Sequence, residues 1–346
     1  MATETPTALV THHDVPGATL ALCSADGVVT RGIGWQDRER TSRLDAAARF
    51  PIYSITKTMI ATILLQLVDD GAFPLDTPLT AVIPDGTDWL DPRITLRQTL
   101  NHTAGLPDYG GQRTYHDSVR AHPETPWDDV AFLACACQLG MQYSPGEGWA
   151  YSNIGYLLLR QAIEQTTGTS FAEAIATRIA RPLGLHKTHV IGCLAAMREL
   201  TPGTSVALSA DDVERNVALR YHPGWVAHGL VASTAAETAR FLYVLLSGSL
   251  VSPESLAAML TPVRVPIVKH PLFREPSYGL GVMLDPAAEG GMLVGHGGGG
   301  PGYSLGVLGL VQEGCVITAA GMANADRGDI GLDLAARELH RMTALS

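Results

Sequence analysis

Strand-like segments lie at both ends of this chain, and helix-like segments fill the long stretch between them. Two short apolar runs flank Ala25-Asp26-Gly27, a turn sequence typical of a β-hairpin. Four more strand-like runs occur near the C-terminus, at residues 279–284, 292–294, 303–311 and 315–322. Between residues 94 and 265 the apolar residues repeat mostly at helical spacing. A chain of 346 residues with this pattern indicates two lobes or one large α/β unit.

The composition excludes several classes of partner. Hydrophobic residues make up 46% of the chain and charged residues 17%, which is typical of a globular protein with a sizeable core. The net charge of -10 and the lack of a basic stripe argue against nucleic acid and anionic membranes as partners. No apolar run approaches the roughly 18 residues of a membrane span. The N-terminus also lacks a positive region followed by an apolar core, so we expect no signal peptide.

The cysteines argue for a reducing compartment and against a metal. The five cysteines are odd in number and scattered, as reduced thiols are. Cys135 and Cys137 lie two residues apart, but no second pair of metal ligands is nearby. We therefore expect a cytoplasmic protein with no metal and no cofactor. The sequence does not indicate its oligomeric state.

The first candidate site is Ser54-Ile55-Thr56-Lys57, which opens a run of helical apolar spacing that ends at Gly71. A hydroxyl and an amine three residues apart on a helix can touch, which is one way to activate a serine nucleophile. The alternative is an ordinary first turn, with Ser54 as helix cap and Lys57 in solvent. Lysine occurs only at positions 57, 187 and 269, so a lysine inside this apolar helix favours function.

The second candidate is Tyr151-Ser152-Asn153, just ahead of another helical run. A phenol near a lysine cation is expected to have a lowered pKa and to act as a general base. Asn153 offers both a donor and an acceptor to an amide. The alternative is that Ser152 or Asn153 caps the helix while Tyr151 packs in the core.

The third candidate is the glycine-rich run from Gly295 to Gly302, which includes His296. Glycines let the backbone approach a ligand and expose N–H groups. A dinucleotide motif is disfavoured because Pro301 interrupts it and a strand follows, and no Gly-Lys-Ser/Thr forms a phosphate loop. Residues 302–306 match the G-x-S-x-G nucleophile elbow around Ser304, and residues 296–299 match a lipase oxyanion motif. That reading needs a helix after the serine, whereas the segment that follows is strand-like.

Taken together, the three elements resemble the penicillin-recognising serine enzymes, a superfamily that includes class C β-lactamases, DD-peptidases, D-aminopeptidases and family VIII esterases. Ser54-x-x-Lys57, Tyr151-x-Asn153 and His296-Gly297-Gly298 occur in the family's order and rough spacing. Three further segments look like family segments and extend the resemblance over most of the chain: residues 101–106, 181–188 and 229–234.

The resemblance implies a fold and a division of the chain. The fold is α+β and β-lactamase/transpeptidase-like, with an antiparallel sheet flanked by helices, a mostly helical second lobe, and the active site in the cleft between them. Residues 1–75 and 265–346 would form the discontinuous lobe that carries the sheet. Residues 76–264 would form the helical lobe.

The resemblance also implies roles for individual residues. Ser54 would be the acylated nucleophile, Lys57 would assist its deprotonation, and Tyr151 would accept the proton and later protonate the leaving group. The backbone N–H groups of Ser54 and Gly299 would form the oxyanion hole. Asn153 would orient the acyl group, and the substrate would also contact His296, Gly297 and Gly298. His102 is expected to be structural, and the role of His228 stays open.

The third motif departs from the Lys-Thr-Gly of β-lactamases and DD-peptidases, because His296 replaces the lysine and Gly297 the hydroxyl residue. A substrate without a penicillin-type carboxylate is therefore expected. The expected function is a serine acyl-enzyme hydrolase of a small-molecule ester or amide, of esterase, amidase or D-aminopeptidase type. The alternative is an acyltransferase that passes the acyl group to an amine or alcohol in small-molecule biosynthesis. A true β-lactamase and a non-catalytic sensor are less favoured.

Overall fold

A computed structural model describes residues 5–343 apart from 85, 210, 212, 268 and 313. Its main feature is an antiparallel sheet whose eight strands run in the order β2-β1-β13-β12-β11-β10-β9-β8. The strands are β1 (Gly17–Ser24), β2 (Gly27–Gly34), β8 (Val263–Arg264), β9 (Ser277–Tyr278), β10 (Met283–Asp285), β11 (Met292–Gly300), β12 (Tyr303–Gln312) and β13 (Cys315–Ala323).

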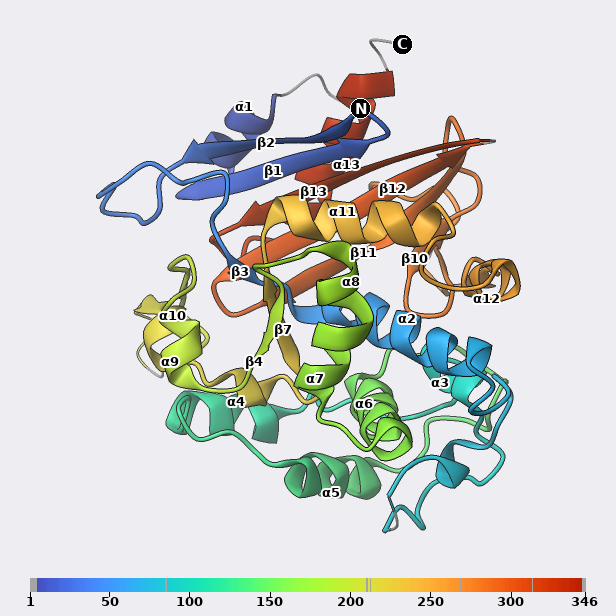
Figure 1. The fold of residues 1–346 in the computed structure, drawn as a ribbon. Helices are drawn as coiled ribbons and strands as arrows, with labels where there is room; N and C mark the ends of the chain where they lie inside the picture. The colour runs from blue at the N-terminus through green and yellow to red at the C-terminus, as the bar shows by residue number, and fades with distance from the viewer. Residues whose placement is uncertain are drawn as a thin grey trace.

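The two ends of the chain meet in this sheet, as the sequence predicts. Strand β1 pairs with β13 in a register that places Ala18 opposite Ala323. The blue N-terminal strands therefore lie beside the red C-terminal ones (Figure 1). The expected β-hairpin is confirmed as β1–β2, closed by the pair Ser24 and Gly27.

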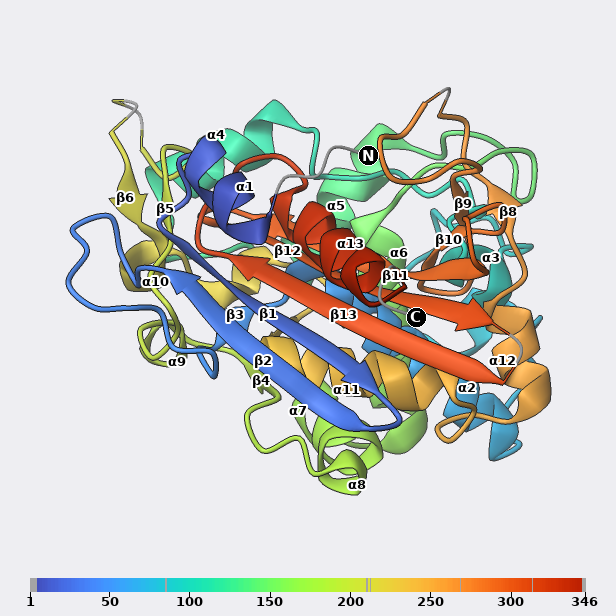
Figure 2. The same ribbon diagram turned by 90° about the horizontal axis from the view of Figure 1, so that it is seen from above.

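Helices cover both faces of the sheet (Figure 2). Helices α1 (Pro6–His12) and α13 (Ile330–Thr343) lie on one face, where α13 packs on β12 and β13. Helix α11 (Ala235–Leu246) lies on the opposite face, and the Ala239 carbonyl accepts a hydrogen bond from Thr318 of β13. Because α11 packs on the sheet, part of the expected helical lobe belongs structurally to the sheet layer. The division at residues 75 and 265 stays a prediction.

Helix α2 (Thr56–Asp69) is buried. The remaining helices are α3 (Leu96–Leu100), α4 (Arg113–Ala121), α5 (Asp129–Leu139), α6 (Asn153–Thr167), α7 (Phe171–Ile175), α8 (Arg181–Leu183), α9 (Leu194–Met197), α10 (Val217–Arg220) and α12 (Pro253–Met259). Of these, α6, α7 and α12 pack against α2. Two small sheets join β3 (Phe50–Pro51), β7 (Leu230–Ser233) and β4 (His189–Ile191), and β5 (Thr204–Ser205) with β6 (Arg215–Asn216). None of the helices in the described part of the chain has the length and apolarity needed to cross a bilayer.

Glycines extend the strands rather than breaking them. Strand β2 includes Gly32 and continues to Gly34. A Cβ at Gly32 would lie 2.1 Å from the Leu44 carbonyl oxygen, so this glycine lets the following loop pack on the strand. Similarly, the strand expected over residues 292–294 continues as β11 to Gly300, because each glycine pairs with β12.

Candidate active site

Ser54 lies in a sharp turn between β3 and α2. The turn is a 3₁₀ segment, Tyr53–Ile55, which leads directly into α2. Tyr53 has a φ of 43°, in the left-handed region that side chains rarely adopt. Its hydroxyl donates to the Pro301 carbonyl oxygen at 3.1 Å, which ties the turn to the connection between β11 and β12. The backbone thus places Ser54 at the start of the helix, as the sequence predicts.

Lys57 lies fully buried in the first turn of α2. Its Nζ is 3.1 Å from the Ser54 Oγ and donates to the Asn153 Oδ1 at 2.7 Å. Nζ also lies 4.9 Å from the centre of the Tyr151 ring. The first two sequence motifs therefore converge on one amine, although Asn153 is 96 residues from Lys57.

Asp108 holds Asn153 in place, and sequence reasoning missed it. The Asn153 backbone N–H donates to the Asp108 Oδ1 at 2.8 Å, and its side-chain Nδ2 donates to Oδ2 at 3.3 Å. Since the amide donates to a carboxylate, its oxygen is left to face Lys57. Burial raises the pKa of Asp108 above its usual value. A signal was present, because Asp108 closely follows the family-like segment at residues 101–106.

Tyr151 differs from expectation in its protonation. Its hydroxyl is hydrogen-bonded to Ser54, and its ring lies 4.4 Å from the His102 ring, centre to centre. Burial raises the pKa of Tyr151 well above its usual 10, so the side chain is a neutral phenol at neutral pH. The expectation that the lysine lowers this pKa is wrong, because desolvation of the buried phenol is the largest influence on it.

The buried position of Lys57 has the corresponding effect on the amine. Desolvation lowers the pKa of Lys57 well below its usual 10.5, and the carboxylate of Asp108 offsets this only in part. A neutral amine has a lone pair that can accept a proton. The structure therefore places a buried amine with a lowered pKa beside Ser54.

His228 is a second side chain that sequence reasoning left open. Both of its ring nitrogens lie 3.4 Å from the Lys57 Nζ, and the ring is hydrogen-bonded to the Tyr53 backbone. Burial, with Lys57 as a further cause, lowers the pKa of His228 well below 6.5, so the ring is neutral. Its position on the segment before β7, 171 residues from Lys57, explains why spacing could not reveal the contact.

The glycine motif contributes mainly through close packing. A Cβ at Gly298 would lie 2.4 Å from the Ile52 carbonyl oxygen, so glycine lets β11 pack against the turn that holds Ser54. A Cβ at Gly297 would meet Leu332 of α13, on the other face of the sheet. A Cβ at Gly299 would meet nothing within 4 Å. Gly299 thus faces open space near Ser54, and its oxyanion role stays a prediction.

The side chain of His296 is already engaged by the protein. Its Nδ1 lies 2.5 Å from the Gly297 carbonyl oxygen, which can only accept, so Nδ1 carries the proton. Nε2 then accepts from the Tyr278 hydroxyl at 2.8 Å. Burial lowers the pKa of His296 to about 3, which makes the ring neutral. Its contact with substrate stays a prediction.

His102 has the geometry of a structural residue. It is buried with a φ of 64°, and its Nδ1 accepts a hydrogen bond from the Ser152 N–H at 3.2 Å. Burial lowers the pKa of His102 well below 6.5. The ring connects the loop after α3 to the segment that carries Tyr151, and Ser152 in turn caps α6.

The alternative nucleophile, Ser304, does not reach solvent. It is buried in β12, where its Oγ donates to the Gly328 carbonyl oxygen at 2.8 Å. Gly302 to Gly306 leads from a turn into a strand, and no helix follows. The nucleophile-elbow reading therefore fails in the structure.

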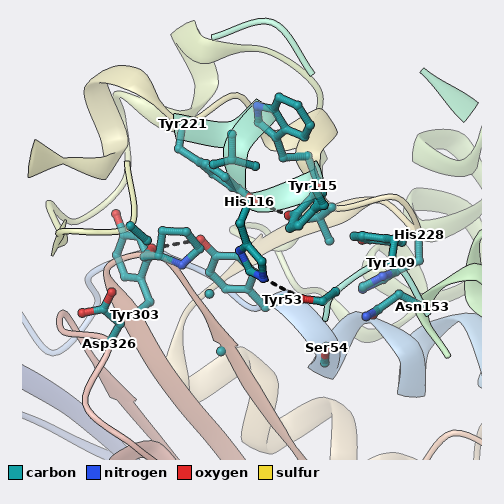
Figure 3. A pocket seen from close by; sticks show the side chains of 18 of the residues that line it. Tyr53, Ser54, Tyr109, Tyr115, His116, Asn153, Tyr221, His228, Tyr303 and Asp326 are labelled. Atoms are coloured by element: carbon teal, nitrogen blue, oxygen red, sulfur yellow. Dashed lines mark hydrogen bonds between the residues drawn. The ribbon is translucent and has the colours of Figure 1, made fainter. Parts of the chain in front are cut away.

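A cavity of about 430 Å³ opens above Ser54 (Figure 3). Ser54, Asn153 and His228 line one end, and Gly299 and Gly300 contribute backbone from β11. Tyr151 does not line it, and instead faces a smaller, apolar pocket of about 100 Å³ that includes Trp149, Tyr278 and His296. Within the described residues, no group of three or more potential ligands could hold a metal ion.

Comparison with known sequences identifies the family. The sequence model of the Beta-lactamase family, described as Beta-lactamase, matches residues 4–338, nearly the whole chain. This chain belongs to the Beta-lactamase family. The fold agrees, since the sheet, its flanking helices and the serine at the start of α2 are those of the β-lactamase/transpeptidase-like fold expected from the sequence.

Several members of the Beta-lactamase family are similar over long stretches. Penicillin-binding protein 4* of Bacillus subtilis is 28% identical over 84% of this chain and 64% of its own length. Esterase EstB of Burkholderia gladioli is 29% identical over 45% of this chain and 42% of its length. A D-stereospecific amidohydrolase from Streptomyces sp. has a solved structure with 30% identity and a TM-score of 0.82, covering 97% of this chain and 96% of that one. The chain spans less than two thirds of the length of the Bacillus subtilis and Burkholderia gladioli proteins.

Proposed function

We propose that this Beta-lactamase-family chain is a serine acyl-enzyme hydrolase of small-molecule esters or amides. The observation that carries the proposal is the 3.1 Å contact between the Ser54 Oγ and the Nζ of the buried Lys57, whose pKa is lowered by desolvation. A serine hydroxyl is a weak nucleophile until a base removes its proton. The names of the esterase and the D-stereospecific amidohydrolase support an ester or amide as the substrate.

In acylation, the Ser54 Oγ attacks the carbonyl carbon of the substrate while its proton passes to Lys57. The carbonyl π electrons move onto the oxygen, and the backbone N–H groups of Ser54 and Gly299 would hold that oxyanion. Loss of one such donor typically costs about 3 kcal/mol in the transition state. The now charged Lys57 is held by the Asn153 oxygen, and Asn153 also lines the cavity that receives the acyl group.

When the tetrahedral intermediate collapses, the carbonyl re-forms and the bond to the leaving nitrogen or oxygen breaks with its electron pair. Tyr151 gives its proton to that atom, and Lys57 returns a proton to Tyr151. A neutral phenol beside Ser54 suits Tyr151 as donor, whereas its raised pKa makes it a poor first acceptor. Water then attacks the acyl carbon while its proton passes to Lys57. When this second tetrahedral intermediate collapses, the bond to the Ser54 Oγ breaks, Lys57 returns the proton to Oγ, and the acid is released.

The third motif supports substrates other than penicillins. A β-lactam carboxylate would need a cation and a hydroxyl where this chain has His296 and Gly297. His296 is neutral and both its ring nitrogens have protein partners. Gly297 has no side chain. We therefore assign β11 a role in packing and through its backbone. The part of the substrate that lies beside β11 is then an uncharged group.

Steady-state kinetics test this proposal. Wild type should turn over members of a panel of p-nitrophenyl esters and amino-acid amides many times, and Ser54→Ala should show no turnover above background. Ser247→Ala, which changes an exposed serine at the end of α11, is the matched control and should behave as wild type. A wild type that is inactive on both panels, or an active Ser54→Ala, would overturn the proposal.

Acyl transfer is the second candidate, and the smaller pocket beside Tyr151 favours it. Among the lining residues are Trp149, Val265, Ile267, Phe273 and Met283, an apolar wall where the leaving group departs and an acceptor would enter. An apolar amine or alcohol seated there would compete with water for the acyl-enzyme. Its signature is a product ratio that moves from free acid to amide as apolar amines are added. An unchanged yield of free acid across a panel of amines would contradict acyl transfer and leave hydrolysis as the proposed function.

A further inference from the structure

If Ser54 acts as proposed, the two pockets would bind different halves of a substrate, the acyl group and the leaving group. Tyr151 must reach the leaving atom, and it lines only the smaller pocket. Ser54, Asn153 and Gly299 line only the larger cavity. The larger cavity therefore receives the acyl group, and the chemistry of its walls determines which acyl groups fit.

Aromatic rings form a large part of those walls, and the hydroxyls of four of the tyrosines are hydrogen-bonded to the protein. The hydroxyls of Tyr53, Tyr115 and Tyr303 donate to the backbone carbonyls of Pro301, Trp225 and Thr201 at 3.1, 3.2 and 2.7 Å. The Tyr109 hydroxyl accepts from the Ala227 N–H at 3.2 Å. Because these groups are already paired, the cavity presents ring surfaces to the acyl group rather than hydroxyls.

One carboxylate lies at the far end of this aromatic cavity. Figure 3 shows Asp326 and Tyr303 at one end and Ser54, Asn153 and His228 at the other. Asp326 is the one aspartate, glutamate, lysine or arginine among the described residues that line the cavity. Its Oδ2 accepts from the Ser205 hydroxyl, and no hydrogen-bond partner is found for Oδ1 in the described part of the chain.

The charges around Asp326 neutralise one another and leave its own charge uncompensated. Arg327 pairs with Glu214 at 3.5 Å, and Arg38 pairs with Glu214 at 2.7 Å and with Asp14 at 3.0 Å. These two arginines and two carboxylates carry no net charge. Near the catalytic end, His228 is neutral. Asp326 thus places a carboxylate at one end of the cavity, and no ion pair to it is found in the described part of the chain.

We infer that Asp326 selects acyl groups that carry a cation, an ammonium or guanidinium, at the end remote from the scissile carbonyl. Tyrosine faces attract cations, and a carboxylate adds an ion pair at the same place. An acyl group that ends in a carboxylate would be repelled by Asp326. Since Asp326 is exposed, the gain is modest, and a preference of about five- to tenfold is expected from an exposed ion pair and a cation–π contact together.

The test uses three p-nitrophenyl esters whose acyl chains have equal length and end in an ammonium, a hydroxyl or a carboxylate. The ratio of kcat/KM for the ammonium ester to that for the hydroxyl ester should be about five to ten in wild type and near one in Asp326→Asn. Asp326→Lys should reverse the order of the ammonium and carboxylate esters. Asp329→Asn, an exposed acid in the same loop that does not line the cavity, should keep the wild-type ratio.

The outcomes separate this inference from the proposed function. Turnover of all three esters at similar rates, or a preference that persists in Asp326→Asn, would overturn the role of Asp326 and leave the hydrolase proposal standing. No turnover of any ester by wild type would instead contradict the hydrolase proposal. Labelling of Ser54 by a fluorophosphonate in each variant shows that the variant has folded, so a lost preference cannot be a folding defect.

Discussion

The most consequential residue is Lys57, whose burial decides the direction in which protons move. Both Lys57 and Tyr151 are removed from water, and burial favours the neutral form of each. Burial thus shifts the pair toward an amine and a phenol and away from an ammonium and a phenolate. In the proposed mechanism, the amine acts as the base and the phenol as the acid of an acyl-transfer cycle.

Replacing Tyr151 with phenylalanine tests its role as proton donor. Tyr151→Phe should lower kcat/KM for amides by about 10²- to 10⁴-fold, because an amine leaves poorly without a proton. The same change should affect a p-nitrophenyl ester much less, since nitrophenolate leaves unprotonated. Tyr143→Phe, at a partly buried tyrosine outside both pockets, is the control. Equal losses of kcat/KM for the amide and the ester in Tyr151→Phe would contradict the role of Tyr151 as proton donor.

The neighbour of Lys57 gives a pH test. Acylation needs neutral Lys57, so kcat/KM should rise with pH through the lowered pKa of Lys57 and then level off. His228→Ala would admit water beside Nζ, reduce its desolvation and raise the pKa of Lys57. The acid limb of the pH profile should therefore move to higher pH in this variant. An acid limb that stays in place would show that His228 does not help to keep Lys57 dry.

At the scale of elements, the site depends on how closely β11 packs against the turn before α2. Gly298 is the point of contact, because its missing Cβ leaves room for the Ile52 carbonyl. The adjacent Gly299 has open space instead. The two glycines look alike in sequence, but the structure gives one a packing role and leaves the other facing the cavity.

A pair of substitutions measures this packing. Gly298→Ala should lower the free energy of unfolding by about 1–3 kcal/mol, since the backbone must shift to relieve the clash. Gly299→Ala should lie within about 0.5 kcal/mol of wild type. Urea denaturation at pH 7 followed by circular dichroism gives both values. Equal stability of the two variants would contradict the packing role of Gly298.

Sequence reasoning reached local features of these elements better than distant contacts. Ser152 and Gly168 mark the ends of α6, and Thr234 caps α11, because capping depends on a few adjacent residues. The order of the motifs along the chain grouped Ser54, Lys57, Tyr151 and Asn153 in one predicted site. In the structure, Ser54, Asn153 and the Tyr151 ring lie around the Lys57 amine. Asp108 was missed, and the role of His228 stayed open, because their contacts join distant segments. The pKa of Tyr151 was misjudged because burial cannot be read from a motif.

At the scale of the whole molecule, the cleft buries three neutral histidines, His102, His228 and His296, and this has a consequence for acid stability. Each has a folded-state pKa below the unfolded value of about 6.5. Below that pH the unfolded chain binds protons that the folded chain does not, so stability falls as pH falls. Each histidine contributes a slope of up to about 1.4 kcal/mol per pH unit between its two pKa values.

His296 allows this linkage to be isolated, since burial lowers its pKa to about 3. From pH 6 to pH 5, wild type should lose more stability than His296→Gln, by about 1 kcal/mol. The exposed His189→Gln is the matched control and should follow wild type. Urea denaturation at both pH values gives the difference. Parallel losses in wild type and His296→Gln would mean that His296 is protonated in the folded protein.

The central claim is that Ser54, and no other serine, becomes acylated. The most direct measurement is the intact mass of the protein after exposure to a fluorophosphonate, followed by peptide mapping of the adduct. We predict one adduct per chain, located on Ser54, formed by wild type and not by Ser54→Ala, and formed much more slowly by Lys57→Met. An unlabelled wild type, or an adduct located on Ser304, would contradict this account.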